Sequence, residues 1–219
     1  STFKIISSYV QLASRRYRPG QCMDCRPFTM NHRRYRCWNR TGHGEIDVTR
    51  ALAISCNGFF FDSFSHDVVL DTVELALTAG YTLVEGETPH IAPDVLIHGD
   101  GLKITPIDQA RLIASLVPGR FSAETRGIPT PFTDPVALAE IRKGMEMAVT
   151  DGSGKGCRIP GYPVAGKTGS WKGARWWASY APADNPTLVV VALTRGGGIH
   201  GGVEVSRRFY NEYLRSQGL

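Results

Sequence analysis

The rhythm of apolar and turn residues changes near residue 160, and this change constrains the fold more than any other feature of the chain. Upstream, long stretches carry helix start and stop signals. Downstream, three short strand-like runs, 162–169, 175–181 and 187–194, are separated by turn residues and precede a last helical stretch. A helical block followed by an antiparallel meander predicts an α+β fold, in which helices pack on an antiparallel sheet.

Local signals place the helices of this block. Apolar residues at i, i+3 and i+7 spacing predict a helix over residues 1–17, which Pro19-Gly20 ends. A capping side chain stands directly before a proline at Thr105-Pro106 and at Asp134-Pro135, as is typical of helix N-termini. Residues 18–44 are predicted to form a loop. Further helices are predicted over 47–54, 65–79, 105–117, 134–150 and 203–214.

Composition excludes two classes of protein. With 42% hydrophobic and 21% charged residues, the chain is too apolar for a disordered segment. Its longest aliphatic run, residues 188–193, is far shorter than the roughly 20 residues that a bilayer-spanning helix needs.

The positive charge is concentrated in residues 15–40. Eight arginines stand there against a single acid, Asp24, which gives this segment +7 and leaves −2 for the rest of a chain whose net charge is +5. A solvated surface region is the first interpretation, contact with anionic lipid the second and nucleic-acid binding the third, because no nucleic-acid-binding module is recognisable.

The same segment contains three of the five cysteines, as Cys22-x-x-Cys25 followed by Cys37. This spacing begins like a zinc knuckle, in which His32 or His43 would supply the fourth ligand. A disulfide from Cys37 to Cys22 or Cys25 is an equally good interpretation in an oxidising compartment. The sequence leaves both open.

Four further residues are interpreted as structural. Cys56 and Cys157 are isolated along the chain and are expected to be small buried hydrophobes. His43, beside a glycine turn, is expected to be a hydrogen-bonded histidine, and Trp38 a packed aromatic. Neither is expected to be catalytic.

Three short motifs point to chemistry: Ser1-Thr2-Phe3-Lys4, Ser55-Cys56-Asn57 and Lys167-Thr168-Gly169-Ser170. Side chains three apart share a helix face, so the ammonium of Lys4 can reach the hydroxyl of Ser1. A lysine acts as a base only where burial or a second cation lowers its pKa. Alone, a Ser-x-x-Lys match is common and carries little weight.

In this order, with the first on a predicted helix and the last on a predicted strand, the motifs match the Ser-x-x-Lys, Ser-x-Asn and Lys-Thr-Gly set of penicillin-binding proteins and serine β-lactamases. Over nearly its whole length the chain resembles the transpeptidase domain of class B penicillin-binding proteins. The stretches Arg34–Trp38, Gly42–Arg50 and Asn57–Phe61 are most similar to the elongation (rod-shape) type.

The resemblance implies a covalent acyl-enzyme mechanism. Ser1 would attack a peptide carbonyl and Lys4 would accept its proton. Ser55, bridging Lys4 and Lys167, would relay a proton to the leaving nitrogen. No metal or organic cofactor is implied.

The resemblance also implies how substrate is held. Asn57 would bind the substrate backbone, and Lys167 with the Thr168–Ser170 segment its carboxylate. Backbone N–H groups of Ser1 and Ser170 would form the oxyanion hole. Residue 170 is serine where the family often has threonine, which keeps the hydroxyl.

The implied function is that of a peptidoglycan D,D-transpeptidase which acts on stem peptides ending in D-Ala-D-Ala and is acylated by β-lactams. The expected place of action is the periplasmic, extracytoplasmic face of the bacterial cytoplasmic membrane, with a glycan polymerase as partner and no nucleic acid. Residues 1–219 would be a single transpeptidase domain that begins at the nucleophile, with upstream strands of the sheet and a membrane anchor missing.

Three alternatives stay open. A serine β-lactamase would need a deacylating base, and no Glu-x-x-Asn match occurs in the usual intervening region. A penicillin-sensing receptor domain would acylate without turnover. A non-catalytic scaffold of the same fold would form no adduct at all.

Overall fold

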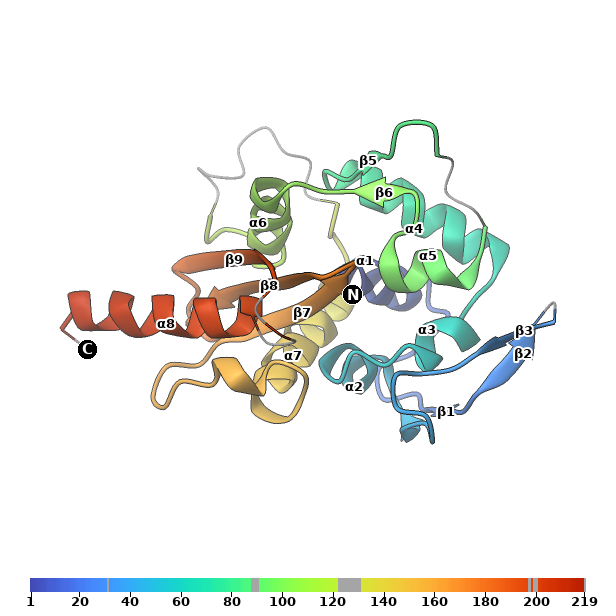
Figure 1. Cartoon of the computed structure of the whole chain (residues 1–219), viewed down its shortest axis with the longest axis horizontal. Helices are drawn as coiled ribbons and strands as arrows, with labels where there is room; N and C mark the ends of the chain where they lie inside the picture. The colour runs from blue at the N-terminus through green and yellow to red at the C-terminus, as the bar shows by residue number, and fades with distance from the viewer. Residues whose placement is uncertain (31, 88–90, 122–130, 197, 199–200, 219) are drawn as a thin grey trace.

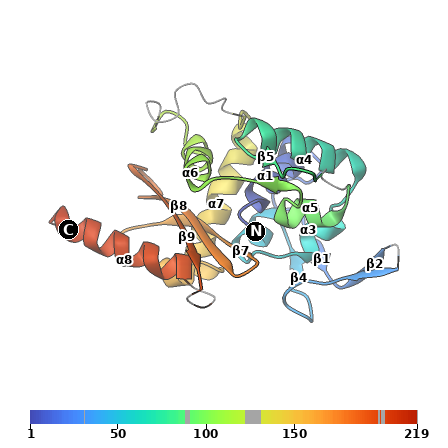
Figure 2. The same cartoon turned by 45° about the horizontal axis from the view of Figure 1, so that its top comes forward.

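The computed structural model describes residues 1–30, 32–87, 91–121, 131–196, 198 and 201–218. Its centre is an antiparallel sheet in the order β7 (Ala165–Trp171), β8 (Ala174–Ala181) and β9 (Leu188–Arg195). Helix α8 (Gly201–Ser216) lies on one side of this sheet, and α1 (Lys4–Ala13) and α7 (Pro135–Asp151) lie on the other (Figures 1 and 2). This arrangement confirms the predicted α+β fold.

Alternation along β8 explains why both faces of the sheet are covered. Successive side chains of a strand point to opposite faces. Ala178 and Tyr180 belong to the main core with the helical block, whereas Trp177 and Ala181 pack in a second core with Tyr210 of α8. All four are fully buried. The pairing of Lys167 with Ala178 therefore turns the Lys167 side chain toward the helical block, away from α8.

The predicted helix starts are confirmed by their caps. Asp47 accepts a 2.7 Å hydrogen bond from the Arg50 backbone N–H, and Asp134 accepts from the N–H groups of Val136 and Ala137, both at 2.9 Å. Ser65 and Thr105 cap their helices in the same way. The helices that follow these caps are α2 (Val48–Ala53), α4 (His66–Thr78), α6 (Pro106–Ser115) and α7.

The predicted loop over 18–44 is wrong. Two short antiparallel pairs occupy it, β1 (Met23–Cys25) with β4 (Gly44–Ile46) and β2 (Phe28–Met30) with β3 (Arg33–Tyr35). The second pair projects from the body (Figures 1 and 2). Each strand is only three residues long, too short for an alternating pattern to stand out in the sequence.

Other boundaries also differ from prediction. Helix α1 covers Lys4–Ala13 in place of 1–17, because residues 2 and 3 form a turn. Strand β7 begins at Ala165 in place of residue 162. The sequence did not predict α3 (Gly58–Asp62), β5 (Thr82–Leu83), α5 (Pro93–His98), β6 (Leu102–Lys103) or the 3₁₀ turn η1 (Lys155–Cys157).

The basic segment is partly neutralised by ion pairs. Arg15 lies 2.8 Å from Asp134, and Arg33 lies 2.8 Å from Asp94. Both guanidinium groups are more than half exposed, so each pair contributes little to stability. These contacts agree with a solvated surface region. Within the described part of the chain, no helix is long and apolar enough to cross a membrane.

Candidate active site

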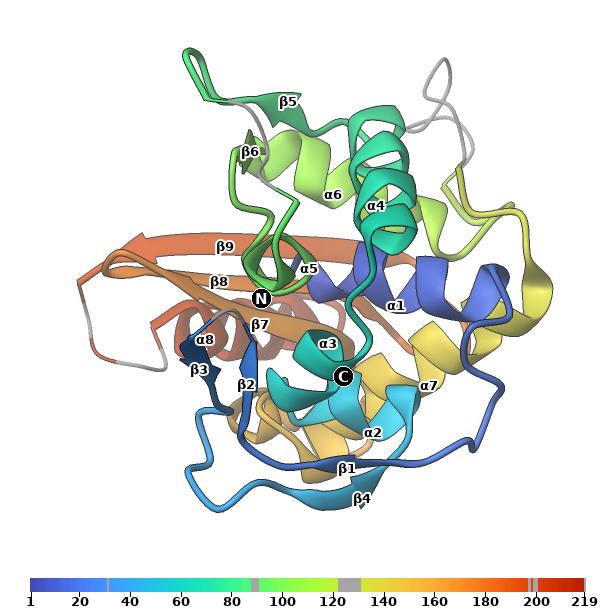
Figure 3. The ribbon, with the colours of Figure 1, turned by 90° about the vertical axis from the view of Figure 1, so that its right-hand side faces the viewer.

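The three motifs meet where α1 begins beside β7. Ser1, Ser55, Asn57 and the segment Thr168–Ser170 line one cavity of about 650 Å³. Figures 1 and 3 show the N-terminus at this junction, between β7 and α5. Residues separated by more than 150 positions in the sequence are thus brought together, as the resemblance implied.

Lys4 is the centre of the hydrogen-bond network in this cavity. Its Nζ lies 3.5 Å from Ser1 Oγ and 3.3 Å from Ser55 Oγ. It also donates to the Ser55 carbonyl at 3.0 Å and to Asn57 Oδ1 at 2.6 Å. The Lys4 side chain is fully buried, so water does not compete for these contacts. The nitrogen is therefore placed to exchange a proton with either hydroxyl.

Burial makes a neutral lysine accessible near neutral pH. Loss of hydration lowers the pKa of Lys4 from 10.5 to about 8, and Coulombic attraction to negative charge at Cys56 and Cys37 acts in the opposite direction. Burial also lowers the pKa of Lys167, and the positive charge of Lys4 adds to this. Two buried ammonium groups side by side disfavour double protonation, which leaves one of the lysines able to act as a base.

Only half of the predicted Ser55 bridge is present. Ser55 contacts Lys4, whereas Lys167 Nζ donates to the Thr168 carbonyl at 3.0 Å. Among the described residues, no hydrogen bond joins Ser55 to Lys167. Of the two hydrogen bonds that the predicted relay needs, the described residues therefore form only the one between Ser55 and Lys4.

The backbone at Ser55 is held in an unusual conformation. Its φ is +56°, a left-handed value that costs a non-glycine residue about 1–2 kcal/mol. Two donors hold its carbonyl: Lys4 Nζ, and Trp38 Nε1 at 3.1 Å. Positive φ values in non-glycine residues persist where surrounding contacts fix them. At Ser55 these contacts direct the hydroxyl into the cavity.

The strand motif is anchored by a residue that sequence reasoning missed. Thr168 Oγ1 lies 2.8 Å from Ser153 Oγ, and Ser153 donates to the Ala53 carbonyl at 3.2 Å. Ser153 follows α7 and lines the same cavity. No local pattern marks it, because its role depends on partners 15 and 100 positions away.

Gly169 is required by the close approach of β7 to the start of α1. A Cβ at this position would lie 3.0 Å from Thr2 Cγ2 and 3.1 Å from Trp176 Cβ. Both distances are shorter than ordinary van der Waals contact. The glycine thus sets the separation between the nucleophile and the strand motif.

The Gly169→Ala variant should lose about 1–3 kcal/mol of unfolding free energy, because the added methyl overpacks this contact. The acylation by penicillin that the resemblance implies should slow as well, since Ser1 is displaced. Chemical denaturation and acylation kinetics measure the two effects. The double variant Gly169→Ala with Thr2→Ser, which removes the contacting methyl, should recover part of both losses. An unchanged single variant would contradict this role.

A second cavity of about 910 Å³ lies on the other side of Ser1 and shares Ser1, His98 and Ser170 with the first. Trp171 also lines it, with its ring 5.8 Å from the His98 imidazole. Burial, then the nearby positive charges, lowers the pKa of His98 to about 4. Neither His98 nor Trp171 was predicted: His98 ends α5, which the sequence did not predict, and Trp171 lies one residue beyond the Lys167–Ser170 motif.

Trp38 and His43 agree with prediction only in part. Trp38 packs its ring against that of His43 with centroids 4.8 Å apart, but it is 62% exposed and lines the first cavity. His43 Nδ1 lies 3.6 Å from Cys25 Sγ and 3.5 Å from Cys37 Sγ, and among the described residues its buried Nε2 has no hydrogen-bond partner. The expected hydrogen-bonded histidine is therefore wrong at Nε2.

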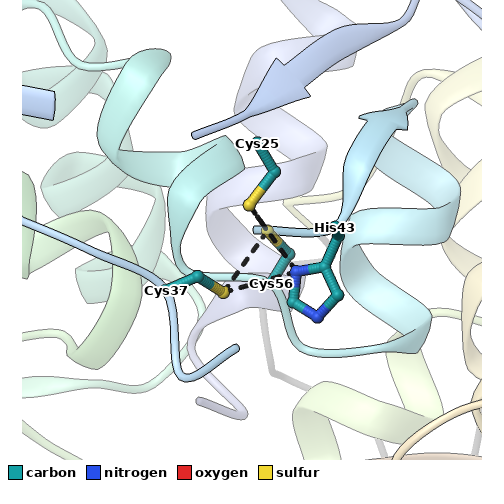
Figure 4. Close-up of side chains that lie close together, drawn as sticks. All are labelled: Cys25, Cys37, His43 and Cys56. Atoms are coloured by element: carbon teal, nitrogen blue, oxygen red, sulfur yellow. Dashed lines mark hydrogen bonds between the residues drawn. The ribbon is translucent and has the colours of Figure 1, made fainter. Parts of the chain in front are cut away.

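The cysteines also arrange differently from prediction. All five are free, so the predicted disulfide from Cys37 is not formed. Cys56 lies with Cys25, Cys37 and His43, whose ligand atoms all fall within 4.8 Å of one another (Figure 4). Cys22 and His32 are exposed and lie outside this group. Cys157 is a buried thiol, as expected.

Comparisons with known proteins identify the fold. The family model described as Penicillin binding protein transpeptidase domain matches residues 1–215. The solved apo structure of the TP domain of Burkholderia pseudomallei penicillin-binding protein 3 matches with a TM-score of 0.80 at 18% identity, over 100% of this chain and 78% of that one.

Two curated relatives are similar in sequence. Peptidoglycan D,D-transpeptidase MrdA of Haemophilus influenzae is 23% identical over 84% of this chain and 39% of its own length. Stage V sporulation protein D of Bacillus subtilis is 24% identical over 87% of this chain and 37% of its own length. The chain thus spans about two fifths of the length of these relatives. Because the family model accounts for nearly every residue, the chain belongs to the penicillin-binding protein transpeptidase domain family.

Proposed function

We propose that the protein is a serine D,D-transpeptidase of peptidoglycan synthesis. The single observation that carries this proposal is the buried amine of Lys4, which lies within hydrogen-bonding distance of Ser1 Oγ, Ser55 Oγ and Asn57 Oδ1. A nucleophile with an adjacent base of lowered pKa is the arrangement that acyl transfer requires. Membership of the transpeptidase family supports the same chemistry.

In the proposed first step, neutral Lys4 accepts the Ser1 proton while Ser1 Oγ attacks the carbonyl carbon of the penultimate D-Ala. We assign the backbone nitrogens of Ser1 and Ser170 to the oxyanion hole, where each donor would contribute about 3 kcal/mol. The peptide bond then breaks, and the proton passes from Lys4 through Ser55 to the leaving D-Ala nitrogen. An ester between Ser1 and the remaining stem peptide is the product.

In the second step, an amine of a neighbouring stem peptide attacks this ester, and the same proton route returns a proton to Ser1 Oγ. We assign the donor to the 650 Å³ cavity, which holds Asn57 for the peptide backbone and Thr168 and Ser170 for the terminal carboxylate. We assign Lys167, the first residue of the strand motif, to the same carboxylate, because a bound negative charge would favour the protonated form of this buried amine. The 910 Å³ cavity on the other side of Ser1 is then open to the acceptor.

We further infer that the protein works at the periplasmic face of the cytoplasmic membrane, because its proposed substrate lies outside the cytoplasm. A glycan polymerase is the proposed partner, since cross-linking needs newly made strands. A peptidoglycan synthase complex among the structural neighbours, with a TM-score of 0.71 to this chain, supports a partnership of that kind. That residues 1–219 act as one domain stays part of this proposal.

A fluorescent penicillin tests the proposal. One stable adduct per chain is expected, with the mass of the intact antibiotic, on the peptide that contains Ser1. Transfer of a D-Ala-D-Ala peptide to an added amine should follow. Rapid release of hydrolysed penicillin would favour a β-lactamase, a stable adduct without peptide transfer a sensor, and no adduct a scaffold. Each of these three outcomes would overturn the proposal.

A further inference from the structure

Four side chains from separate segments converge beside the middle motif. Cys25 ends β1, Cys37 follows β3, His43 precedes β4, and Cys56 stands within Ser55-Cys56-Asn57. Figure 4 shows the three sulfurs and the imidazole directed toward a common centre. The three cysteines are at most 5% exposed.

The spacing of these ligand atoms suits one tetrahedral metal ion. Zinc binds thiolate sulfur at about 2.3 Å and imidazole nitrogen at about 2.0 Å, which puts tetrahedral ligands roughly 3.5–3.8 Å apart. Cys56 Sγ lies 3.7 Å from Cys37 Sγ and 3.2 Å from Cys25 Sγ. His43 Nδ1 lies 3.5 and 3.6 Å from the sulfurs of Cys37 and Cys25. Small adjustments would satisfy all four bonds.

The surroundings are shaped to this cluster. Gly58 leaves room for the Cys25 sulfur, because a Cβ there would lie 2.5 Å from it. The Asn57 backbone N–H donates to Cys37 Sγ at 3.2 Å, which favours a thiolate at that position. The Trp38 and His43 rings pack edge to face with their centroids 4.8 Å apart, and this contact fixes the imidazole plane. Such outer contacts orient ligands in metal centres.

We propose that Cys25, Cys37, His43 and Cys56 bind one Zn²⁺ ion in a closed structural site. Three thiolates and one imidazole fill all four positions, so the ion has no open site for substrate. Binding releases the thiol protons and involves no redox step. Because Cys56 separates Ser55 from Asn57, the ion would fix the backbone that carries both site residues.

Metal analysis of the purified protein tests the site directly. One zinc per chain is expected, and exchange with Co²⁺ should produce thiolate-to-cobalt absorption and strong tetrahedral d–d bands. Chelation should lower Tm by about 5–10 °C. Cys37→Ser should lose the zinc and the cobalt spectrum. Cys22→Ser, which alters an exposed cysteine of the same segment, is the matched control and should keep both.

If Cys37→Ser does not fold, zinc content and thiol reactivity of the unaltered protein provide the test. Absence of zinc after incubation with Zn²⁺, with all thiols reactive, would overturn it. A Cys25–Cys56 disulfide found by thiol counting in the protein as isolated would also overturn it. The effect on Ser55 rests on the proposed function: chelation should slow penicillin acylation at least tenfold, and added zinc should restore it. The metal content and the cobalt spectrum stand whether or not acylation occurs.

Discussion

The Ser1→Ala variant should form no covalent adduct with penicillin, while its unfolding free energy stays within about 1 kcal/mol of the unaltered protein. The substitution removes the only Ser1 atom able to form the ester. It leaves Lys4 bonded to the Ser55 carbonyl and to Asn57, so the cavity keeps its geometry. Fluorescence of the denatured band and intact-protein mass measure the adduct, and chemical denaturation measures stability.

Ser8→Ala is the matched control for this variant. Ser8 lies on α1, is fully buried, and its Oγ has no hydrogen-bond partner among the described residues. Loss of that hydroxyl should leave both labelling and stability unchanged. Persistent labelling of Ser1→Ala would assign the nucleophile elsewhere, and the labelled peptide would then identify it.

Local signals made most helices and the meander predictable. Asp134 bonds to N–H groups only two and three residues ahead, so its cap is visible in the sequence itself. The strands β7 to β9 are seven or eight residues long and separated by short turns. By contrast, β1 pairs Met23 with Ile46, and no local pattern records a partner that far away.

The same distinction applies to the site. Ser1, Lys4 and the strand motif were found because the residues of each motif lie within four consecutive positions. Ser153 was missed because it acts through Thr168 and Ala53, contacts that exist only in the folded chain. Cys56 was predicted to be isolated because 19 positions separate it from Cys37, although their sulfurs lie 3.7 Å apart. Ser153 and Cys56 can therefore be recognised only in the folded chain, where segments far apart in the sequence lie close together.

The Lys4→Met variant should lose about 10²–10⁴-fold in penicillin acylation rate, because it removes the base that we propose takes the Ser1 proton. The pH profile should change with it. In the unaltered protein the rate should rise about tenfold per pH unit up to the Lys4 pKa of about 8, as the neutral amine forms. In Lys4→Met this rise should disappear. Lys143→Met, an exposed position on α7, should leave rate and profile unchanged.

The stability of the protein should increase as the pH rises, because the Lys4 charge is unfavourable at its buried position in the folded state. Lys4 has a pKa of about 8 in the folded protein and about 10.5 when unfolded, so the unfolded chain binds more protons between these values. The unfolding free energy of the protein therefore rises with pH across that window, and below pH 8 the buried charge costs up to about 3 kcal/mol.

Lys4→Met removes this cost and loses the hydrogen bonds to Ser55 and Asn57. Its stability relative to the unaltered protein should consequently be highest near pH 7 and decline by pH 10. A constant difference across that range, or acylation within tenfold of the unaltered rate, would show that Lys4 is not the buried base.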